Sequence, residues 1–200
     1  MNAESTTSPI EEILAWALPK YLDPAVEIVR EHPVSYRGVE FRLDFLLRHP
    51  TGLYGLECDG KEYHSYFRDV FRDACILGIT DIAAIYRITG KDISFHAETA
   101  LHLMAADVPA LFSPRGRANL RTLSQFRDES LICASYDNVS AFHERSFREF
   151  VVMKLDRREE DQYWHELFTF AQRYPAKTMA EIATAYINRS SIRENHTRWE

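Results

Sequence analysis

The stretch from Glu40 to Lys61, "EFRLDFLLRHPTGLYGLECDGK", decides the fold. It holds two runs rich in aromatic and branched residues, separated by the turn residues His49 to Gly52. Two such runs around a short loop predict a β-hairpin. Placing Arg48 opposite Leu53 separates apolar from charged residues cleanly, whereas a shift of one residue would mix them. The sequence therefore predicts the register as well as the strands.

This register gives the hairpin a core face and a charged face. The core face pairs apolar or small residues, namely Phe41, Leu43, Phe45 and Leu47 with Gly60, Cys58, Leu56 and Tyr54. The charged face pairs Arg42 with Asp59, Glu40 with Lys61, and Asp44 with Glu57. The first two are ordinary cross-strand ion pairs. The third sets two like charges opposite each other, with Cβ atoms about 5 Å apart, which is unfavourable without compensation.

A divalent cation would compensate Asp44 and Glu57. Mg²⁺ prefers oxygen ligands at about 2.1 Å and often takes one or two carboxylates, with water and substrate phosphate completing its shell. Such an ion polarises a phosphodiester and activates water. Lys61 and His64 follow closely and would add a cation and a titratable base. The alternative is an edge hairpin whose two carboxylates extend into water.

The flanking sequence predicts an α/β domain over residues 8–107. Ser8 suits a helix N-cap, and Glu11 stands three residues later as in a capping box. Hydrophobic periodicity and turn residues predict helices over 8–18, 65–79 and 91–107, and further strands over 23–34 and 81–90. The expected order is helix, three strands, helix, strand and helix.

Residues 108–200 are expected to form a basic linker and a mainly helical extension. Helices are predicted over 146–174 and 177–190, with a short strand in 130–137. Arg115, Arg117 and Arg121 are candidate contacts to nucleic-acid phosphates, and Gly116 would let the backbone approach one. The alternative is a solvated linker and helix start.

The composition is that of a globular protein. The 200 residues are 46% hydrophobic and 27% charged, with three cysteines. No apolar run of about 18 residues and no secretion signal is present, so we expect no membrane span and a cytoplasmic location. The cysteines are far apart, which argues for a reducing compartment and against structural zinc.

The net charge of −6 is unevenly distributed. Residues 1–107 hold 10 Lys and Arg against 17 Asp and Glu, whereas residues 108–200 hold 14 against 13. An acidic first half suits a site whose carboxylates attract cations. Contacts to a nucleic-acid backbone would then have to come from elsewhere in the chain.

Five short motifs in this order resemble the restriction-endonuclease-like PD-(D/E)xK superfamily, most closely its very-short-patch repair endonuclease-like branch. They are "SPIEE" (8–12), "RLDFLL" (42–47), "GLECDGKEYH" (55–64), "FRDACILG" (71–78) and "AAIYRITG" (83–90). The resemblance covers about residues 8–95. It implies a restriction-endonuclease-like core of helix, three strands, helix and strand.

The resemblance also implies roles for individual residues. Asp44 and Glu57 would bind Mg²⁺, or Mn²⁺ as a substitute, together with the backbone carbonyl of Cys58. Glu11 would help to hold the ion through water, and its capping role is compatible with that. His64 would act as the base or as a phosphate contact.

Some positions depart from the family pattern or allow two interpretations. Asp59 stands where the superfamily usually has a catalytic lysine, so Lys61 would have to supply the amine, and Asp59 is either a further ligand or the partner of Arg42. Arg87 is a candidate phosphate contact, with a structural ion pair as the alternative. Arg72 and Asp73 match the family's Arg-Asp, but we interpret them as charges on an exposed helix face.

We expect a magnesium-dependent endonuclease acting on DNA, with His64 as the base and Lys61 as an electrostatic helper. A catalytically inactive module of the same fold, binding nucleic acid or a protein partner, is the alternative, and a phosphodiesterase acting on RNA is a third. A homodimer and a subunit of a larger complex are both compatible with the sequence. We expect no membrane partner.

Overall fold

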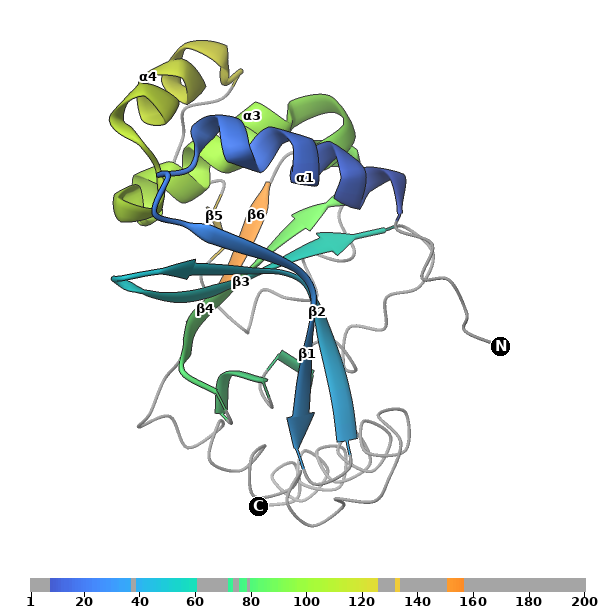
Figure 1. The fold of residues 1–200 in the computed structure, drawn as a ribbon. Helices are drawn as coiled ribbons and strands as arrows, with labels where there is room; N and C mark the ends of the chain where they lie inside the picture. The colour runs from blue at the N-terminus through green and yellow to red at the C-terminus, as the bar shows by residue number, and fades with distance from the viewer. Residues whose placement is uncertain are drawn as a thin grey trace, which may run out of the picture.

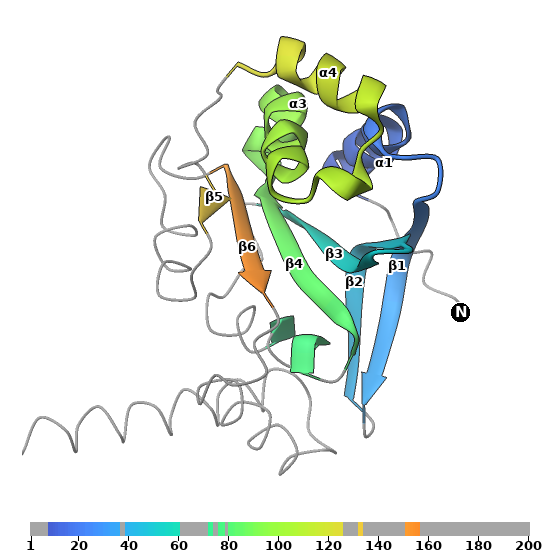
Figure 2. The same cartoon turned by 90° about the vertical axis from the view of Figure 1, so that its left-hand side faces the viewer.

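The computed structural model describes residues 8–36, 39–60, 72–73, 76–78, 80–125, 132–133 and 151–156. These residues form a mixed α/β fold in which helices cover one face of a mixed sheet (Figures 1 and 2). The elements run in the order α1 (Pro9–Tyr21), β1 (Glu27–Tyr36), β2 (Val39–His49), β3 (Gly52–Asp59), β4 (Ile82–Thr89), α3 (Gly90–Asp107), the 3-10 helix η1 (Pro109–Leu111), α4 (Pro114–Leu123), β5 (Ile132–Cys133) and β6 (Val152–Asp156).

The sheet has the strand order β1-β2-β3-β4-β6-β5. Strand β2 is antiparallel to both β1 and β3, β4 runs parallel to β3, and β6 is antiparallel to β4. The two-residue strand β5 pairs in parallel with β6. The predicted strands of residues 8–107 are therefore present.

The predicted hairpin register is confirmed next to the loop, whereas the predicted pairs of Asp44 with Glu57 and of Leu43 with Cys58 are not part of the ladder. The β2–β3 ladder pairs Arg48 with Leu53 and continues to Phe45 opposite Leu56. It ends there, one pair before Asp44 and Glu57. The C-terminal half of β1 and the N-terminal half of β2 turn away from β3 (Figure 1). The β1–β2 pairing is itself interrupted at Glu31 and Asp44, where Glu31 has a left-handed backbone with φ 48°.

The bend changes the predicted core face at one end. Phe45, Leu47, Leu56 and Cys58 belong to the main apolar cluster beneath the helices, as expected. Leu43 is fully buried on the other face, where its methyl groups lie 3.4 Å from the position that a Cβ on Gly55 would occupy. The strict alternation of core and charged side chains predicted for β2 is therefore wrong on the N-terminal side of Asp44, because the strand turns at that residue.

The helical layer is built from α1, α3 and α4, which contact one another. Ser8 accepts a hydrogen bond from the Glu11 amide (3.3 Å) at the start of α1, as predicted. Thr89 and Ser113 cap α3 and α4 in the same way. The main cluster joins this layer to the sheet through buried aliphatic and aromatic residues, including Leu14, Leu18, Leu101, Met104, Tyr86 and Ile88.

The described residues after 107 belong to the same packed unit as those before it. Helix α4 packs on α1 and α3, and β6 is the neighbour of β4 in the sheet. Residues 152–156 form a strand, so the helix predicted over 146–174 is wrong there, because pairing with β4 outweighs local helical periodicity. Strand β5 lies within the predicted short strand. Most of the predicted helix 65–79 and all of 177–190 lie outside the described residues.

Within the described part of the chain, no helix combines the length and the apolar character needed to cross a membrane.

Candidate functional site

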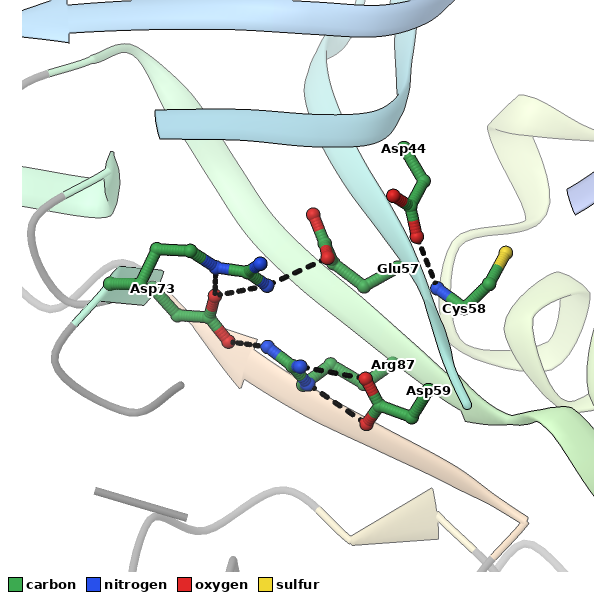
Figure 3. A network of polar contacts seen from close by, with 7 residues as sticks. Asp44, Glu57, Cys58, Asp59, Asp73 and Arg87 are labelled. Carbon is green, nitrogen blue, oxygen red and sulfur yellow. Dashed lines mark hydrogen bonds and ion pairs between the residues drawn. The ribbon is translucent and has the colours of Figure 1, made fainter. Parts of the chain in front are cut away.

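Asp44 lies at the corner where β2 leaves β3. Its Oδ2 accepts a hydrogen bond from the backbone N–H of Cys58, at 2.7 Å (Figure 3). The Asp44 side chain thus accepts a hydrogen bond from a backbone amide of β3 that lies beyond the last ladder pair. This contact is at the point where the two strands separate. Burial raises the pKa of Asp44, opposed by the Cys58 amide and helped by repulsion from Glu11.

Glu57 is a buried carboxylate on β3, with only 3% of its surface exposed. Its Oε2 accepts a hydrogen bond from Arg72 at 2.6 Å, whereas its buried Oε1 has no partner among the described residues. Burial raises the pKa of Glu57 to about 8, even though Arg72 lowers it, and the nearby charge of Asp44 adds to the increase. The charge of Asp44 thus acts on Glu57, although the two residues do not face each other in the β2–β3 ladder.

A chain of alternating charges continues from Glu57 into the protein. Arg72 also contacts Asp73, through Nε and a terminal nitrogen, both at 3.2 Å from Oδ1. The other oxygen of Asp73 accepts from Arg87 at 2.6 Å. Arg87 then binds Asp59 with two nitrogens, at 3.0 and 2.6 Å (Figure 3). Asp73 and Arg87 are completely buried.

This network corrects two interpretations made from sequence. Asp59 pairs with Arg87 and not with Arg42, which instead contacts Glu31 at 3.3 Å. The reason is topological, since the parallel pairing of β3 with β4 brings Arg87 beside this end of β3. Arg87 forms ion pairs in the protein interior. From the sequence, this role was the alternative to a phosphate contact. Attraction from Asp59 and Asp73 outweighs the effect of burial and keeps the pKa of Arg87 well above its usual value.

Arg72 and Asp73 are the residues whose role the sequence interpretation missed. They were assigned to an exposed helix face, but the Asp73 side chain is completely buried and that of Arg72 is 19% exposed. The available signal was the Arg-Asp pair in "FRDACILG", because a charged pair in a mainly apolar segment needs partners if it is buried.

Glu11 belongs to the same region. Its charge raises the pKa values of both Asp44 and Cys58, so the first turn of α1 approaches the separating strands. This placement is compatible with its predicted role beside the metal as well as with its position in the capped helix. Lys61 and His64 lie outside the described residues.

The predicted basic strip lies away from the carboxylates. Arg115, Arg117 and Arg121 are exposed on α4, which meets the opposite end of α1 from Glu11. Helix α1 has 13 residues and is therefore about 20 Å long. Gly116 does not lie open to a phosphate as predicted, because a Cβ there would come within 2.0 Å of the carbonyl oxygen of Tyr21.

The charges at the site leave room for a cation. Among the described residues, the carboxylates Asp44, Glu57, Asp59 and Asp73 outnumber the guanidinium groups of Arg72 and Arg87 around this network. Glu57 Oε1 is a buried acceptor that has no hydrogen-bond partner in the described protein. The residues present therefore fit a divalent ion.

A complete ligand set is not visible in the described part of the chain. No group of three or more His, Cys, Asp or Glu side chains there is arranged to hold a metal ion. A carboxylate pair needs no third side chain for Mg²⁺, which commonly keeps several waters.

Comparisons with protein-family models, with curated proteins and with solved structures found no match for this chain.

Proposed function

We propose that the chain is a metal-dependent endonuclease of the restriction-endonuclease-like fold that hydrolyses DNA phosphodiester bonds. The observation that carries the proposal is the pair Asp44 and Glu57, two carboxylates with raised pKa values at the point where β2 and β3 separate. Burying two such groups together is costly unless a cation compensates them.

The arrangement of elements supports the proposal. Helix α1 precedes three antiparallel strands, and β4 pairs with β3 in parallel. This order agrees with the first helix and the four strands of the core that the resemblance implies, while most of the helix expected between β3 and β4 lies outside the described residues. The motif residues Asp44, Glu57 and Glu11 come from three different elements, and the charge of Glu11 acts on Asp44 while that of Asp44 acts on Glu57.

The proposed ion would be held by Asp44, Glu57 and the carbonyl of Cys58, with Glu11 acting through water. Mg²⁺ supplies Lewis-acid polarisation of a phosphodiester and a water of lowered pKa. The chain itself would hold these ligands in place through the Cys58 amide on Asp44 and through Arg72 on Glu57. We assign proton transfer or phosphate contact to His64, and a helper role to Lys61.

A bound DNA duplex would contact the carboxylate site and α4 at the same time. One turn of duplex is about 34 Å long. A strip of three arginines at the far end of α1 can therefore contact phosphates of the same turn as the reacting one. The pairing of these arginines with DNA phosphates is part of the proposal.

A catalytically inactive module of the same fold is the second candidate, and one observation favours it. Asp59 occupies the position where an amine is expected, and it is fully engaged by the buried Arg87. In that case the carboxylates would be structural and the chain would bind nucleic acid or a protein partner without cleaving.

The test is cleavage by the purified full chain. Plasmid, single-stranded DNA and RNA are each incubated with Mg²⁺, with Mn²⁺ and with chelator. We expect metal-dependent nicking of plasmid that is lost in Asp44→Ala and Glu57→Gln. Glu40→Gln is the matched control, because Glu40 is an exposed carboxylate on the same strand as Asp44.

Two results would reject the endonuclease. Cleavage that survives chelation or both site substitutions would exclude the proposed metal centre. A folded wild-type protein that binds DNA without cleaving it under any metal condition would favour the inactive module. Cleavage of RNA alone would retain the chemistry and change the substrate.

A further inference from the structure

Two arginines serve the buried carboxylates in different ways. Arg87 is completely buried and is held by Asp59 on one side and by Asp73 on the other. Arg72 keeps 19% of its side chain exposed and joins Asp73 to Glu57. One guanidinium is therefore enclosed by its partners, whereas the other lies at the border between the network and solvent.

Arg72 binds the carboxylate that a metal ion would also bind. Its terminal nitrogen lies 2.6 Å from Glu57 Oε2, and Glu57 is 3% exposed. A buried carboxylate needs a compensating positive charge, and in the described protein Arg72 provides it. A divalent ion at Glu57 would supply the same compensation, and the two cations would then repel each other at close range.

Asp73 gives Arg72 a second position. The guanidinium already contacts Asp73 Oδ1 through two nitrogens, and Asp73 is fixed from its other side by Arg87. If Arg72 released Glu57, it would therefore remain paired with Asp73, and its charge would not be left without a partner. This is the arrangement expected for a counter-ion that yields to a ligand.

We propose that Arg72 is the resident counter-ion of the metal site: it neutralises Glu57 in the metal-free protein and releases that carboxylate when a divalent ion binds. This inference rests on the proposed metal centre. It makes Arg72 a positioning residue that keeps the site folded before loading and lowers its affinity for metal.

The test measures Mn²⁺ binding to the full chain by calorimetry, independently of cleavage. We compare the wild type with Arg72→Gln, Arg72→Lys and Arg48→Gln. Arg48 is the control, since it forms an exposed ion pair with Glu27 at 3.4 Å. Arg72→Gln is expected to bind Mn²⁺ at least about tenfold more tightly, because the competing charge is gone. Arg72→Lys and Arg48→Gln should remain within about threefold of the wild type.

Thermal unfolding gives the second readout. Without metal, Arg72→Gln should melt below the wild type, because Glu57 loses its buried partner. Saturating Mn²⁺ should raise the melting temperature more in Arg72→Gln than in the wild type. Equal or weaker Mn²⁺ binding by a folded Arg72→Gln protein would overturn the inference.

A measurement on the wild type guards against a variant that does not fold. Addition of Mg²⁺ should shift the Nε–H nuclear magnetic resonance signal of Arg72 and leave that of Arg87 in place. Mg²⁺ binding without any change at Arg72 would overturn the inference while the metal centre stands. If neither the wild type nor Arg72→Gln binds a divalent ion, the metal centre and the inference both fall.

Discussion

Asp44 serves both the backbone and the proposed metal, and the two roles can be separated by substitution. An asparagine keeps an oxygen that can accept from the Cys58 amide, whereas an alanine leaves that N–H without its partner. We expect Asp44→Asn to weaken Mn²⁺ binding at least about tenfold with little change in metal-free melting temperature. Asp44→Ala should lose metal binding and also destabilise by about 1–3 kcal/mol.

Calorimetry and thermal unfolding check this prediction side by side. Asp44→Asn protein that binds Mn²⁺ like the wild type would remove Asp44 from the ligand set. Asp44→Ala protein that is as stable as Asp44→Asn would show that the hydrogen bond from Cys58 contributes nothing.

Glu57 predicts a pH dependence of the metal-free protein. Its pKa is about 8 in the folded state, against an ordinary value of 4.5, chiefly because of burial. A carboxyl group with a raised pKa binds its proton more tightly when folded, so its contribution is fully present below about pH 4.5 and is lost as pH rises through about 8. Between pH 6 and 8.5 the wild type should therefore lose stability relative to Glu57→Gln.

The measurement is melting temperature against pH in the presence of chelator. We expect the difference between the two proteins to change by on the order of a few degrees over this range. Glu40→Gln, an exposed carboxylate, should follow the wild type. Parallel curves for wild type and Glu57→Gln would contradict the raised pKa.

At the residue scale, local alternation predicted the β2–β3 register next to the loop, but neither the separation of the strands at Asp44 and Glu57 nor the partner of Asp59. Register follows from neighbouring residues in one hairpin, where a shift would bury charge. The Asp59–Arg87 pair depends on which strand lies beyond β3, and that choice is made 28 residues further along the chain. The burial of Asp73 and Arg72 was missed for the same reason, because a short charged motif does not show which distant elements will pack over it.

At the scale of elements, the contact of α4 with α1 depends on Gly116. A Cβ at this position would meet the Tyr21 carbonyl oxygen at 2.0 Å, and that oxygen belongs to the backbone and cannot swing aside. Gly116→Ala should therefore force the helices apart and destabilise the protein by about 1–3 kcal/mol. Gly60→Ala is the matched control, since none of the described residues lies within 4 Å of a Cβ there.

Denaturant unfolding of the two variants checks this prediction. The midpoint should fall for Gly116→Ala and stay near the wild-type value for Gly60→Ala. If Gly116→Ala were as stable as the wild type, the close approach of α4 to Tyr21 would be wrong.

Elements with strong local signals were predictable, and those defined by distant pairing were not. Caps at Ser8 and turn residues around His49 and Gly52 fixed α1 and the hairpin. Strand β6 carries "VMKLD" inside a segment of helical periodicity, and only the edge of β4 makes it a strand. The bend at Glu31 and Asp44 was likewise not predicted, because neither residue is a glycine or a proline.

For the whole molecule, the distribution of charge makes salt dependence the decisive observable for DNA binding. If Arg115, Arg117 and Arg121 bind phosphates, changing all three to glutamate should weaken binding to every sequence alike. The dependence of log affinity on log salt should flatten by roughly one unit for each phosphate that is no longer neutralised. Arg48→Glu, which changes an exposed arginine outside α4, provides the control.

Fluorescence anisotropy with a labelled duplex over a range of salt concentrations measures this slope. An unchanged slope in the triple variant would show that the arginines of α4 do not bind phosphates and that α4 is a solvated helix that packs on α1 and α3.

The pairing of β4 with β6 has a consequence for synthesis of the protein. Strand β4 ends at Thr89 and its neighbour begins at Val152, with 62 residues between them. At about 5–20 residues per second, a ribosome needs roughly 3–12 s to make that interval. During this time the nascent chain presents one side of β4 without its final neighbour, an edge suited to pairing with other chains. A chaperone that binds nascent strands would meet this protein at β4, and a ribosome stalled before Val152 would hold it in its most aggregation-prone form.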